Sequence, residues 1–354
     1  MHKNYNLLSL DPMYSPLHEY IAEIIAKNKY AVTSCWAKKI YLPTYKFILA
    51  SKLIRNCEGI VTDKVISKIK GMCTYHQAYA KKVEKRKLND DELNYMARFY
   101  LALKEFIISK KINFVIMHND TRWYHAIAVM ICKELEIKFL ITEQGLIRPN
   151  TTVIDNNGVN ATANLRLIER VVESNSNKEY LPRHTHDSYV SMLFFLIFLS
   201  IFTCERMFKS KGLLRYMHNQ YGLKKYKKLF VRRINKKRKN GDKIYNNSAL
   251  LILQLQSDSQ FLMYSVFESN QELINKIQKK CFLLGCKLAV KKHPLDELDY
   301  ELNDGSYFVS GEITALSEQA KIVITINSSA IMSVIKTKVP LYIIGESMFI
   351  IEKG

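Results

Sequence analysis

The chain has 354 residues, of which 48% are hydrophobic and 24% are charged. These are ordinary globular values, and they exclude wholesale disorder, collagen and coiled coil. Lys and Arg number 53 against 33 Asp and Glu, so the formal net charge is +20. A surplus of this size favours an anionic partner such as nucleic acid, acidic lipid headgroups or a phosphorylated substrate. The length favours two domains.

Cysteine usage and the first residues indicate the compartment. The seven cysteines are an odd number and include no CxxC pair, which argues against a disulfide framework or a zinc site. The first twenty residues lack the apolar core of a signal peptide. We therefore expect reduced thiols and a chain that stays in the cytoplasm.

The first half of the chain has an α/β pattern. Residues 58–63 are compatible with an early strand, and 88–110 predict a helix that packs on the sheet. Residues 113–117 form a short apolar run, 123–136 carry apolar residues at helical spacing, and 138–142 are a second apolar run. This strand–helix–strand pattern indicates a parallel sheet.

An apolar segment and a basic segment follow. Residues 190–202 are thirteen nearly uninterrupted apolar residues, fewer than the roughly 20 that span a bilayer. Residues 205–243 contain fifteen Lys or Arg and two acids, with interleaved aromatic residues. The pair fits helices that lie on an anionic inner leaflet. A buried core helix, a solvated linker and a nucleic-acid-binding segment are the alternatives.

The last third alternates regularly between strands and helices. The expected strands are 249–255, 287–291, 307–310, 321–326 and 340–344, and the expected helices are 271–284, 313–320 and 329–336. This is the doubly wound pattern, whose ligand site lies at the carboxyl ends of the strands. We expect an N-terminal α/β domain at 1–185, a linker at 186–246 and a Rossmann-like domain at 247–354.

Polar residues follow two of these strands. Ser328 and Ser329 open a predicted helix, which makes a natural phosphate site, although a helix N-cap is their ordinary role. Lys292 and His293 precede Pro294 and could neutralise the same phosphate, although His-Pro is ordinarily a turn. No P-loop, dinucleotide fingerprint or nucleophile elbow competes with them.

Residues 143–160 resemble a signature of the capsule polysaccharide biosynthesis family. They contain a Glu-x-Gly turn at 143–145, a Pro-Asn-Thr segment and an Asp-x-x-Gly-Val-Asn box that begins at Asp155. A Gln-x-x-x-Asp-Ser element at 254–259, the His-Pro pair and the Ser-Ser pair follow in the family's order, and the resemblance runs from 113 to 345. Two departures are Asn150, where Gly is usual, and His118-Asn119-Asp120, where the family often has Asn-Gly.

The resemblance implies a GT-B-like α/β fold, with two Rossmann-like domains facing a cleft and the apolar and basic segments between them. It implies a β-Kdo transferase, which moves the sugar acid Kdo from CMP-Kdo to a glycan or glycolipid acceptor in capsule or lipopolysaccharide synthesis. It implies retention through an aspartate nucleophile. Because a leaving phosphodiester needs charge neutralisation more than a proton, we expect no obligatory metal and no cofactor. A CMP-sialic acid sialyltransferase is the nearest rival. A non-catalytic basic protein that binds nucleic acid or lipid is the alternative from another class.

The resemblance also implies residue roles. Asp155 would be the nucleophile, with a turn-forming role before Asn156-Asn157-Gly158 as the alternative. Glu143 would be the general base, and Arg122 would pair with the sugar carboxylate. CMP would be bound by Lys292, His293, Pro294, Ser328 and Ser329. The position of Gln254, Gln256 and Glu346 near strand ends, and not the resemblance, suggests that they face the cytidine or ribose. We expect a peripheral protein on the inner face of the cytoplasmic membrane, with no nucleic acid partner.

Overall fold

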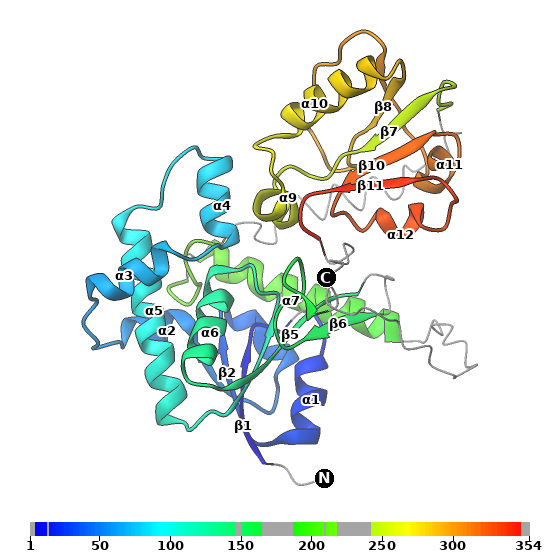
Figure 1. Cartoon of the computed structure of the whole chain (residues 1–354). Helices are drawn as coiled ribbons and strands as arrows, with labels where there is room; N and C mark the ends of the chain where they lie inside the picture. The colour runs from blue at the N-terminus through cyan, green and yellow to red at the C-terminus, as the bar shows by residue number, and fades with distance from the viewer. Residues whose placement is uncertain are drawn as a thin grey trace.

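The computed structural model describes residues 4–12, 14–145, 151–164, 187–208, 210–217 and 242–347. These residues form two α/β domains, each built on one sheet (Figure 1). The N-terminal sheet has the order β3-β2-β1-β4-β5-β6, and the C-terminal sheet has the order β11-β10-β7-β8-β9. Numbered within each domain, both contain the strand order 3-2-1-4-5 of doubly wound folds.

The N-terminal sheet is parallel except for its last strand, which runs antiparallel to its neighbour. Its strands are β1 (Tyr5–Leu10), β2 (Ala26–Thr33), β3 (Lys46–Leu49), β4 (Phe114–His118), β5 (Lys138–Gln144) and β6 (Thr152–Asp155). Its helices are α1 (Leu17–Ile25), the 3-10 helix η1 (Trp36–Tyr41), α2 (Ala50–Arg55), α3 (Asp63–Lys70), α4 (Tyr75–Lys82), α5 (Asp90–Ser109) and α6 (Trp123–Glu134).

A local cap starts helix α5, and apolar contacts to β4 place α5 and α6 on this sheet. Asn89 caps α5 by accepting a hydrogen bond from the Glu92 N–H, and the Glu92 carboxylate reaches back to the Asn89 N–H. Leu103 of α5 and Ile127 of α6 then bury their side chains against Val115 of β4 in one apolar cluster. The predicted unit of β4, α6 and β5 is confirmed, with β4 parallel to β5.

The predicted strand at 58–63 is wrong. The chain has no strand between α2 and α3, and α3 begins at Asp63. Glu58, Gly59 and Ile60 are exposed, so this stretch has no buried face to hold it in a sheet. The strands β1, β2 and β3 were not expected from the sequence, and they complete the sheet instead.

The C-terminal sheet is parallel throughout. Its elements are β7 (Ser248–Ile252), α9 (Ser259–Tyr264), α10 (Asn270–Leu283), β8 (Lys287–Lys291), β9 (Ser306–Phe308), α11 (Ile313–Ser317), β10 (Ile322–Ile326), α12 (Ile331–Val334) and β11 (Leu341–Ile344). Every predicted strand of this domain is present. The predicted helix at 329–336 is wrong in length, because α12 has only four residues.

The apolar segment forms a longer helix than its thirteen-residue core indicated. Helix α7 (Asp187–Met207) has 21 residues, and by length and composition alone it could cross a membrane, a test that core helices also pass. It lies against η1, where Phe198 and Phe202 are buried. The Glu205 carboxylate accepts hydrogen bonds from the N–H groups of Trp36 (2.7 Å) and Ala37 (3.0 Å).

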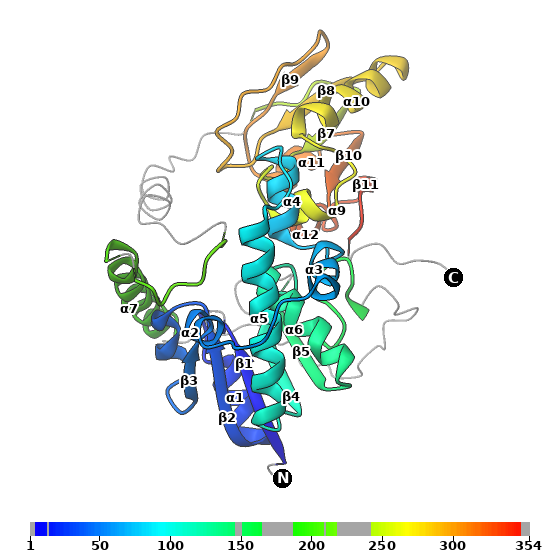
Figure 2. The ribbon, with the colours of Figure 1, turned by 90° about the vertical axis from the view of Figure 1, so that its left-hand side faces the viewer.

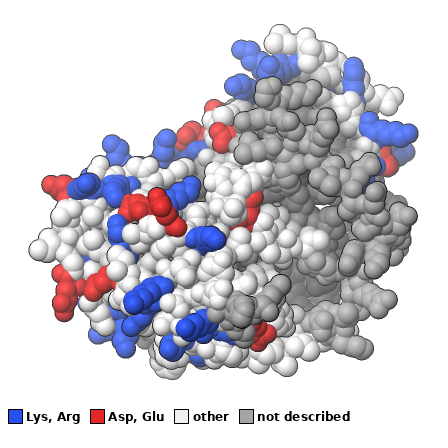
Figure 3. Space-filling view, turned by 60° about the horizontal axis from the view of Figure 1, so that its bottom comes forward, with Lys and Arg blue, Asp and Glu red and all other residues white. Residues whose placement is uncertain are grey.

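The basic segment falls mostly outside the described residues. Ten of the fifteen Lys and Arg residues of 205–243 lie at 218–241. On the face shown in Figure 3, the described Lys and Arg are interspersed with Asp and Glu rather than gathered in one patch. The expected basic surface therefore stays a prediction.

Helix α4 joins the two domains. It packs on α9, as both ribbon views show (Figure 2). The Tyr75 hydroxyl donates to the Ser257 carbonyl (2.8 Å), and the Lys82 ammonium donates to the carbonyls of Ser265 (2.9 Å) and Phe267 (3.0 Å). Tyr75 is also part of the apolar core of the C-terminal domain, so this contact fixes how the two sheets face each other.

Candidate functional site

A cavity of about 310 Å³ lies between the domains, and we call it the interdomain cavity. It is lined by residues that follow strands of both sheets: Asn119, Glu143, Gln144, Gly145 and Asn160 from one domain, and Gln254, Asp258, Ser259, Gln260, His293, Asn327, Ser328, Ser329 and Ser347 from the other. The carboxyl ends of both sheets therefore face one cleft, which confirms the predicted GT-B-like arrangement. Doubly wound folds bind ligands at this edge.

Glu143 is the carboxylate of β5 that reaches the interdomain cavity. Its Oε2 accepts a hydrogen bond from the Asn119 side-chain amide (2.5 Å), and its Oε1 accepts one from the Gln144 N–H (2.8 Å). The His118 Nε2 lies 3.7 Å from Oε1. Because burial lowers the pKa of His118 well below its usual value, the imidazole is neutral at pH 7. Neutral donors thus hold Glu143 in place at these contacts.

Asn119 owes its position to an uncommon backbone conformation. Its φ is +67°, in the left-handed region that Asn tolerates better than most residues. The Asn119 N–H donates to the Thr142 carbonyl (2.8 Å), and its side-chain oxygen accepts from the Thr121 N–H (2.7 Å). This tight turn after β4 aims the Asn119 amide at Glu143. The departure from Asn-Gly noted in the sequence lies in this turn.

Asp155 organises a turn outside the interdomain cavity. Its Oδ1 accepts from the N–H groups of Asn157 (2.7 Å) and Gly158 (3.1 Å), and its Oδ2 accepts from the Asn164 N–H (2.9 Å). Asp155 is not among the residues that line the cavity. The structure therefore gives Asp155 the turn-forming role that the sequence left open, and its role as nucleophile stays a prediction.

The remaining residues of the box connect the turn to the cleft. A Cβ at Gly158 would lie 1.8 Å from the Thr162 hydroxyl and 2.9 Å from the Asp120 carboxylate, so only glycine fits. The Asp120 carboxylate accepts hydrogen bonds from Asn160 (3.1 Å) and Thr162 (3.1 Å), and burial raises its pKa. The Asn160 side-chain oxygen in turn accepts a hydrogen bond from the Gln260 side-chain amide of the other domain.

His293 lines the cavity from the carboxyl end of β8. Its Nδ1 accepts a hydrogen bond from the Leu295 N–H (3.1 Å). Burial lowers the pKa of His293, and the nearby Asp258 and Asp296 oppose that effect without cancelling it. A neutral imidazole that accepts at Nδ1 carries its proton at Nε2. His293 is thus a neutral hydrogen-bond donor rather than the cation that we expected.

Lys292 and Pro294 line a different cavity, of about 550 Å³, together with Asp242 and Ser310. The Lys292 ammonium donates to the Leu298 carbonyl and lies 3.8 Å from the Asp299 carboxylate. His293 also lines this cavity, whereas Lys292 does not line the interdomain cavity.

The Ser-Ser pair and two amides complete the C-terminal wall. Helix α12 begins only at Ile331, so Ser328 and Ser329 lie in the turn before it, where both line the interdomain cavity. The Ser328 hydroxyl accepts a hydrogen bond from the Ala330 N–H (3.3 Å). The carbonyl oxygens of the Gln254 and Asn327 side chains are buried without a partner among the described residues. Buried acceptors are rarely left unpaired, so these two oxygens fit a ligand that donates hydrogen bonds.

Gln256 and Glu346 have structural contacts instead. The Gln256 side-chain oxygen accepts from the Asn270 N–H (2.8 Å) at the start of α10. Glu346 is exposed, and its carbonyl accepts from the Asn327 side-chain amide (2.8 Å). Neither side chain lines the interdomain cavity.

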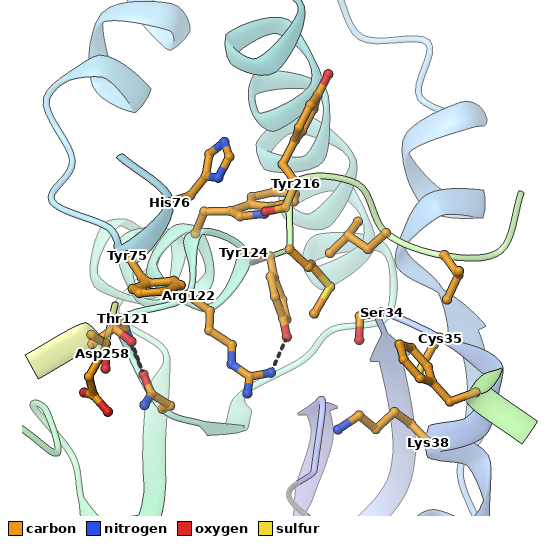
Figure 4. Close-up of a pocket in the computed structure, with 17 residues that line it drawn as sticks. Ser34, Cys35, Lys38, Tyr75, His76, Thr121, Arg122, Tyr124, Tyr216 and Asp258 are labelled. Carbon is orange, nitrogen blue, oxygen red and sulfur yellow. Dashed lines mark hydrogen bonds between the residues drawn. The ribbon is translucent and has the colours of Figure 1, made fainter. Parts of the chain in front are cut away.

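A second cavity, of about 160 Å³, adjoins the first and shares Asn119, Asp258 and Ser259 with it. We call it the aromatic cavity (Figure 4). Its other lining residues are Ser34, Cys35, Lys38, Tyr75, His76, Thr121, Arg122, Trp123, Tyr124, Phe202, Leu213, Leu214, Tyr216 and Met217. Arg122 lies here and not in the interdomain cavity. Lys38 was missed because β2, which leads into η1, was not predicted.

No group of three His, Cys, Asp or Glu side chains suited to a metal ion occurs within the ranges that the structure describes. The expectation of a metal-independent site stays a prediction, because part of the chain lies outside those ranges.

The family model described as "Capsule polysaccharide biosynthesis protein" matches residues 113–352, about two thirds of the chain. The chain belongs to the capsule polysaccharide biosynthesis family. The capsule polysaccharide modification protein LipB of Neisseria meningitidis serogroup B is 24% identical over 223 residues, which are 56% of this chain and 52% of LipB. The chain thus spans about half the length of this curated relative.

Two solved structures of Thermosulfurimonas dismutans KpsC are similar to this family member. The β-Kdo 2,7 transferase has a TM-score of 0.40 and 10% identity, with 97% of this chain and 80% of that chain covered. The β-Kdo 2,4 transferase has a TM-score of 0.38 and 14% identity, with 67% and 70% covered.

Proposed function

We propose that this capsule-biosynthesis family member is a glycosyltransferase that moves Kdo from CMP-Kdo to a glycan or glycolipid acceptor. One observation carries the proposal. The interdomain cavity sets the Glu143 carboxylate of one domain opposite the imidazole of His293 and the hydroxyls of Ser328 and Ser329 from the other. The carboxylate thus lies across the cleft from hydrogen-bond donors that can bind a phosphate. This arrangement suits transfer of a sugar from a nucleotide. Membership of the family, and the resemblance of residues 143–160 to the signature of its β-Kdo transferases, support the choice of Kdo.

The donor nucleotide fits the C-terminal wall. The His293 Nε2–H and the two serine hydroxyls would donate to the phosphate of CMP and stabilise it as it leaves. The unpaired oxygens of Gln254 and Asn327 suit the amino group of cytosine or the hydroxyls of ribose. We propose no cofactor other than the CMP-sugar.

The proposed reaction is a double displacement with retention. A carboxylate oxygen bonds to C2 of Kdo as the C2–O bond to the phosphate breaks and CMP leaves. The acceptor hydroxyl then attacks C2, its proton passes to a base, and the bond between C2 and the carboxylate breaks. The family signature favours Asp155 as nucleophile and Glu143 as base. The position of Glu143 in the cavity makes it the competing nucleophile.

The deciding experiment is incubation with CMP-Kdo in the absence of acceptor, followed by intact-protein mass measurement. We expect the mass of one Kdo residue to be added to the chain. Peptide mapping then assigns the adduct to Asp155, Glu143 or Asp120. Turnover of CMP-sialic acid in preference to CMP-Kdo would make the chain a sialyltransferase. Saturable DNA binding without turnover of either donor would support the non-catalytic alternative.

We also propose that the protein works at the inner face of the cytoplasmic membrane, with α7 lying on anionic lipid. Along α7, Val190, Leu193 and Ile197 are exposed, whereas Phe198 and Phe202 are buried against the N-terminal domain. The segment that follows in sequence is strongly basic. An exposed apolar helix face next to clustered positive charge is complementary to an anionic bilayer surface.

A further inference from the structure

The aromatic cavity contains two cationic side chains from different elements. Arg122 is the residue before α6, and Lys38 lies in η1. In Figure 4 the Arg122 guanidinium and the Lys38 ammonium extend into the same space. Two positive charges that face one small cavity repel each other unless an anion lies between them.

Arg122 has most of its hydrogen-bonding capacity unused. Its Nη1 donates to the Tyr124 hydroxyl (3.1 Å), and no Asp or Glu forms an ion pair with it among the described residues. A guanidinium has five N–H donors in a planar fork that matches a carboxylate. Arg122 can therefore bind a carboxylate with two parallel hydrogen bonds while it keeps its contact to Tyr124.

Lys38 is almost completely buried, with 2% of its surface exposed. Its ammonium donates to the Pro12 carbonyl (3.0 Å) and lies 5.3 Å from the centres of the Tyr14 and Phe198 rings. Burial lowers the pKa of Lys38, and the charge of Asp11 opposes that effect. An additional anion near Lys38 would stabilise its charged form.

The buried carboxylate of Asp11 lies near these cations and already accepts several hydrogen bonds. Asp11 accepts hydrogen bonds from the Ser34 N–H (2.8 Å), the Ser34 hydroxyl and the Tyr124 hydroxyl (2.6 Å). At the mouth of the cavity, one oxygen of Asp258 caps α9 by accepting from the Gln260 N–H (2.9 Å).

The histidines around the cations do not add charge at neutral pH. Burial lowers the pKa of His18 to about 3 and lowers the pKa values of His118 and His125 well below the usual range. The anions that act on these cations are therefore the carboxylates of Asp11 and, beside Arg122, Glu143, and neither forms an ion pair with Arg122 among the described residues.

The walls of the aromatic cavity suit a sugar ring. Tyr75, Trp123 and Tyr216 line it, and the Trp123 indole N–H donates to the Tyr216 carbonyl (3.1 Å), which fixes the ring. Apolar walls with a few fixed polar groups are typical of small-molecule sites. The volume of about 160 Å³ is below the usual range for a drug-sized ligand and suits about one sugar residue.

We propose that the aromatic cavity binds a sugar-acid residue of the acceptor, with its carboxylate held by Arg122 and Lys38. This inference rests on the proposed function, and it reassigns Arg122 from the donor sugar to the acceptor. The cavity includes none of His293, Ser328 and Ser329, which would hold the donor phosphate. It extends from the shared residues toward the end of β2 and toward Phe202 of α7. A lipid-linked acceptor could enter from the side of α7.

The test measures binding without any transfer. The chain has two tryptophans: Trp36 is 53% exposed, and Trp123 is 2% exposed and lines the cavity. In a Trp36→Phe background, Trp123 fluorescence is titrated with the methyl glycoside of Kdo and with its neutral carboxamide. We expect the acid to bind at least about tenfold more tightly than the amide, because only the acid pairs with both cations. Equal affinities for the acid and the amide would overturn the proposal, and this comparison needs no substitution in the cavity.

Variants give a second comparison in the same background. Arg122→Gln and Lys38→Met should each abolish the preference for the acid, and Arg122→Lys should retain part of it. Arg98→Gln and Lys39→Met are matched controls outside the cavity and should retain it fully. The proposal fails if Arg122→Gln keeps the preference for the acid but weakens CMP-Kdo binding, since Arg122 would then hold the donor carboxylate. Absence of Kdo transfer with the acid preference intact would contradict the proposed function and leave the subsite standing.

Discussion

The side-chain carbonyl of Asn160 accepts a hydrogen bond from the side-chain amide of Gln260, and this bond crosses the cleft between the domains. Asn160 belongs to the Asp-x-x-Gly-Val-Asn box, and Gln260 directly follows the Gln-x-x-x-Asp-Ser element. Asn160 also donates to Asp120. Two family motifs that are a hundred residues apart in sequence are thus joined at the wall of one cavity.

Changing Glu143 to Gln should lower the rate of Kdo transfer by about 10²- to 10⁴-fold, the usual contribution of a positioned acid–base group. CMP affinity should be unchanged, because Glu143 faces the nucleotide wall from the other domain. Single-turnover transfer and CMP calorimetry measure the two effects. Glu318→Gln, an exposed change away from the cavity, is the control. Transfer at the wild-type rate would remove Glu143 from the mechanism.

The Asp155→Asn variant separates the two roles considered for Asp155. Asn keeps one oxygen for the turn but loses the acceptor for the Asn164 N–H. We therefore expect the free energy of unfolding to fall by about 1 kcal/mol. If Asp155 is the nucleophile, transfer also falls by orders of magnitude and the Kdo adduct disappears, while CMP binding survives. Denaturant unfolding and transfer are measured on the same sample. Near-normal transfer with reduced stability assigns Asp155 to the turn alone.

His293→Ala should weaken CMP binding and turnover together, by about tenfold each. The reason is that a hydrogen bond to the phosphate is lost in both the ground state and the transition state. The lowered pKa of His293 adds a pH prediction. Between pH 7 and 8 the imidazole stays neutral, so its contribution to CMP affinity should be constant there. Calorimetry of wild type and variant across this range gives the comparison. Unchanged CMP affinity in a folded variant would exclude His293 from the donor site.

Changing Gly158 to Ala should destabilise the N-terminal domain by about 1–3 kcal/mol or more, the usual cost of overpacking. The added methyl group would meet the Thr162 hydroxyl at 1.8 Å and the Asp120 carboxylate at 2.9 Å. Gly71→Ala is the matched control, since its added Cβ would have no neighbour closer than 3.5 Å. Thermal unfolding measures both variants. A Gly158→Ala protein as stable as Gly71→Ala would contradict the described packing.

If α7 lies on lipid, the protein should sediment with anionic vesicles and be released by high salt, because salt screens the attraction. Leu193→Glu with Ile197→Glu should reduce sedimentation, since both side chains are exposed on α7. Phe282→Glu, a change of an exposed apolar residue on α10, is the control and should sediment like wild type. Equal binding of wild type to neutral vesicles would contradict the electrostatic part.

The sequence predicted the C-terminal domain better than the N-terminal one, and periodicity explains the difference. Strands such as β7 and β10 are short, continuous apolar runs, so their carboxyl ends could be located within a few residues. Strand β2 begins Ala26-Lys27-Asn28-Lys29, and its polar start hides it from a search for apolar runs. The aromatic cavity was missed with it, since Ser34 and Lys38 follow that strand.

Individual side chains were harder to assign than strand ends. Gln254, His293, Ser328 and Ser329 line the interdomain cavity, because the carboxyl ends of parallel strands meet at one edge. Gln256 instead contacts the start of α10. The direction of a side chain after the last strand residue depends on the loop that follows, and neither apolar periodicity nor motif spacing contains that information.

The anchoring of η1 by Glu205 links helix α7 to the aromatic cavity, and this link affects how the turnover rate should depend on acceptor concentration. Phe202 of α7 is part of the wall that also contains Lys38, and Glu205 ties the end of α7 to the first residues of η1. With α7 lying on a bilayer, the acceptor would be encountered by two-dimensional diffusion. Turnover would then follow the mole fraction of acceptor in the membrane plane, and inert lipid would slow the protein by surface dilution at constant bulk concentration.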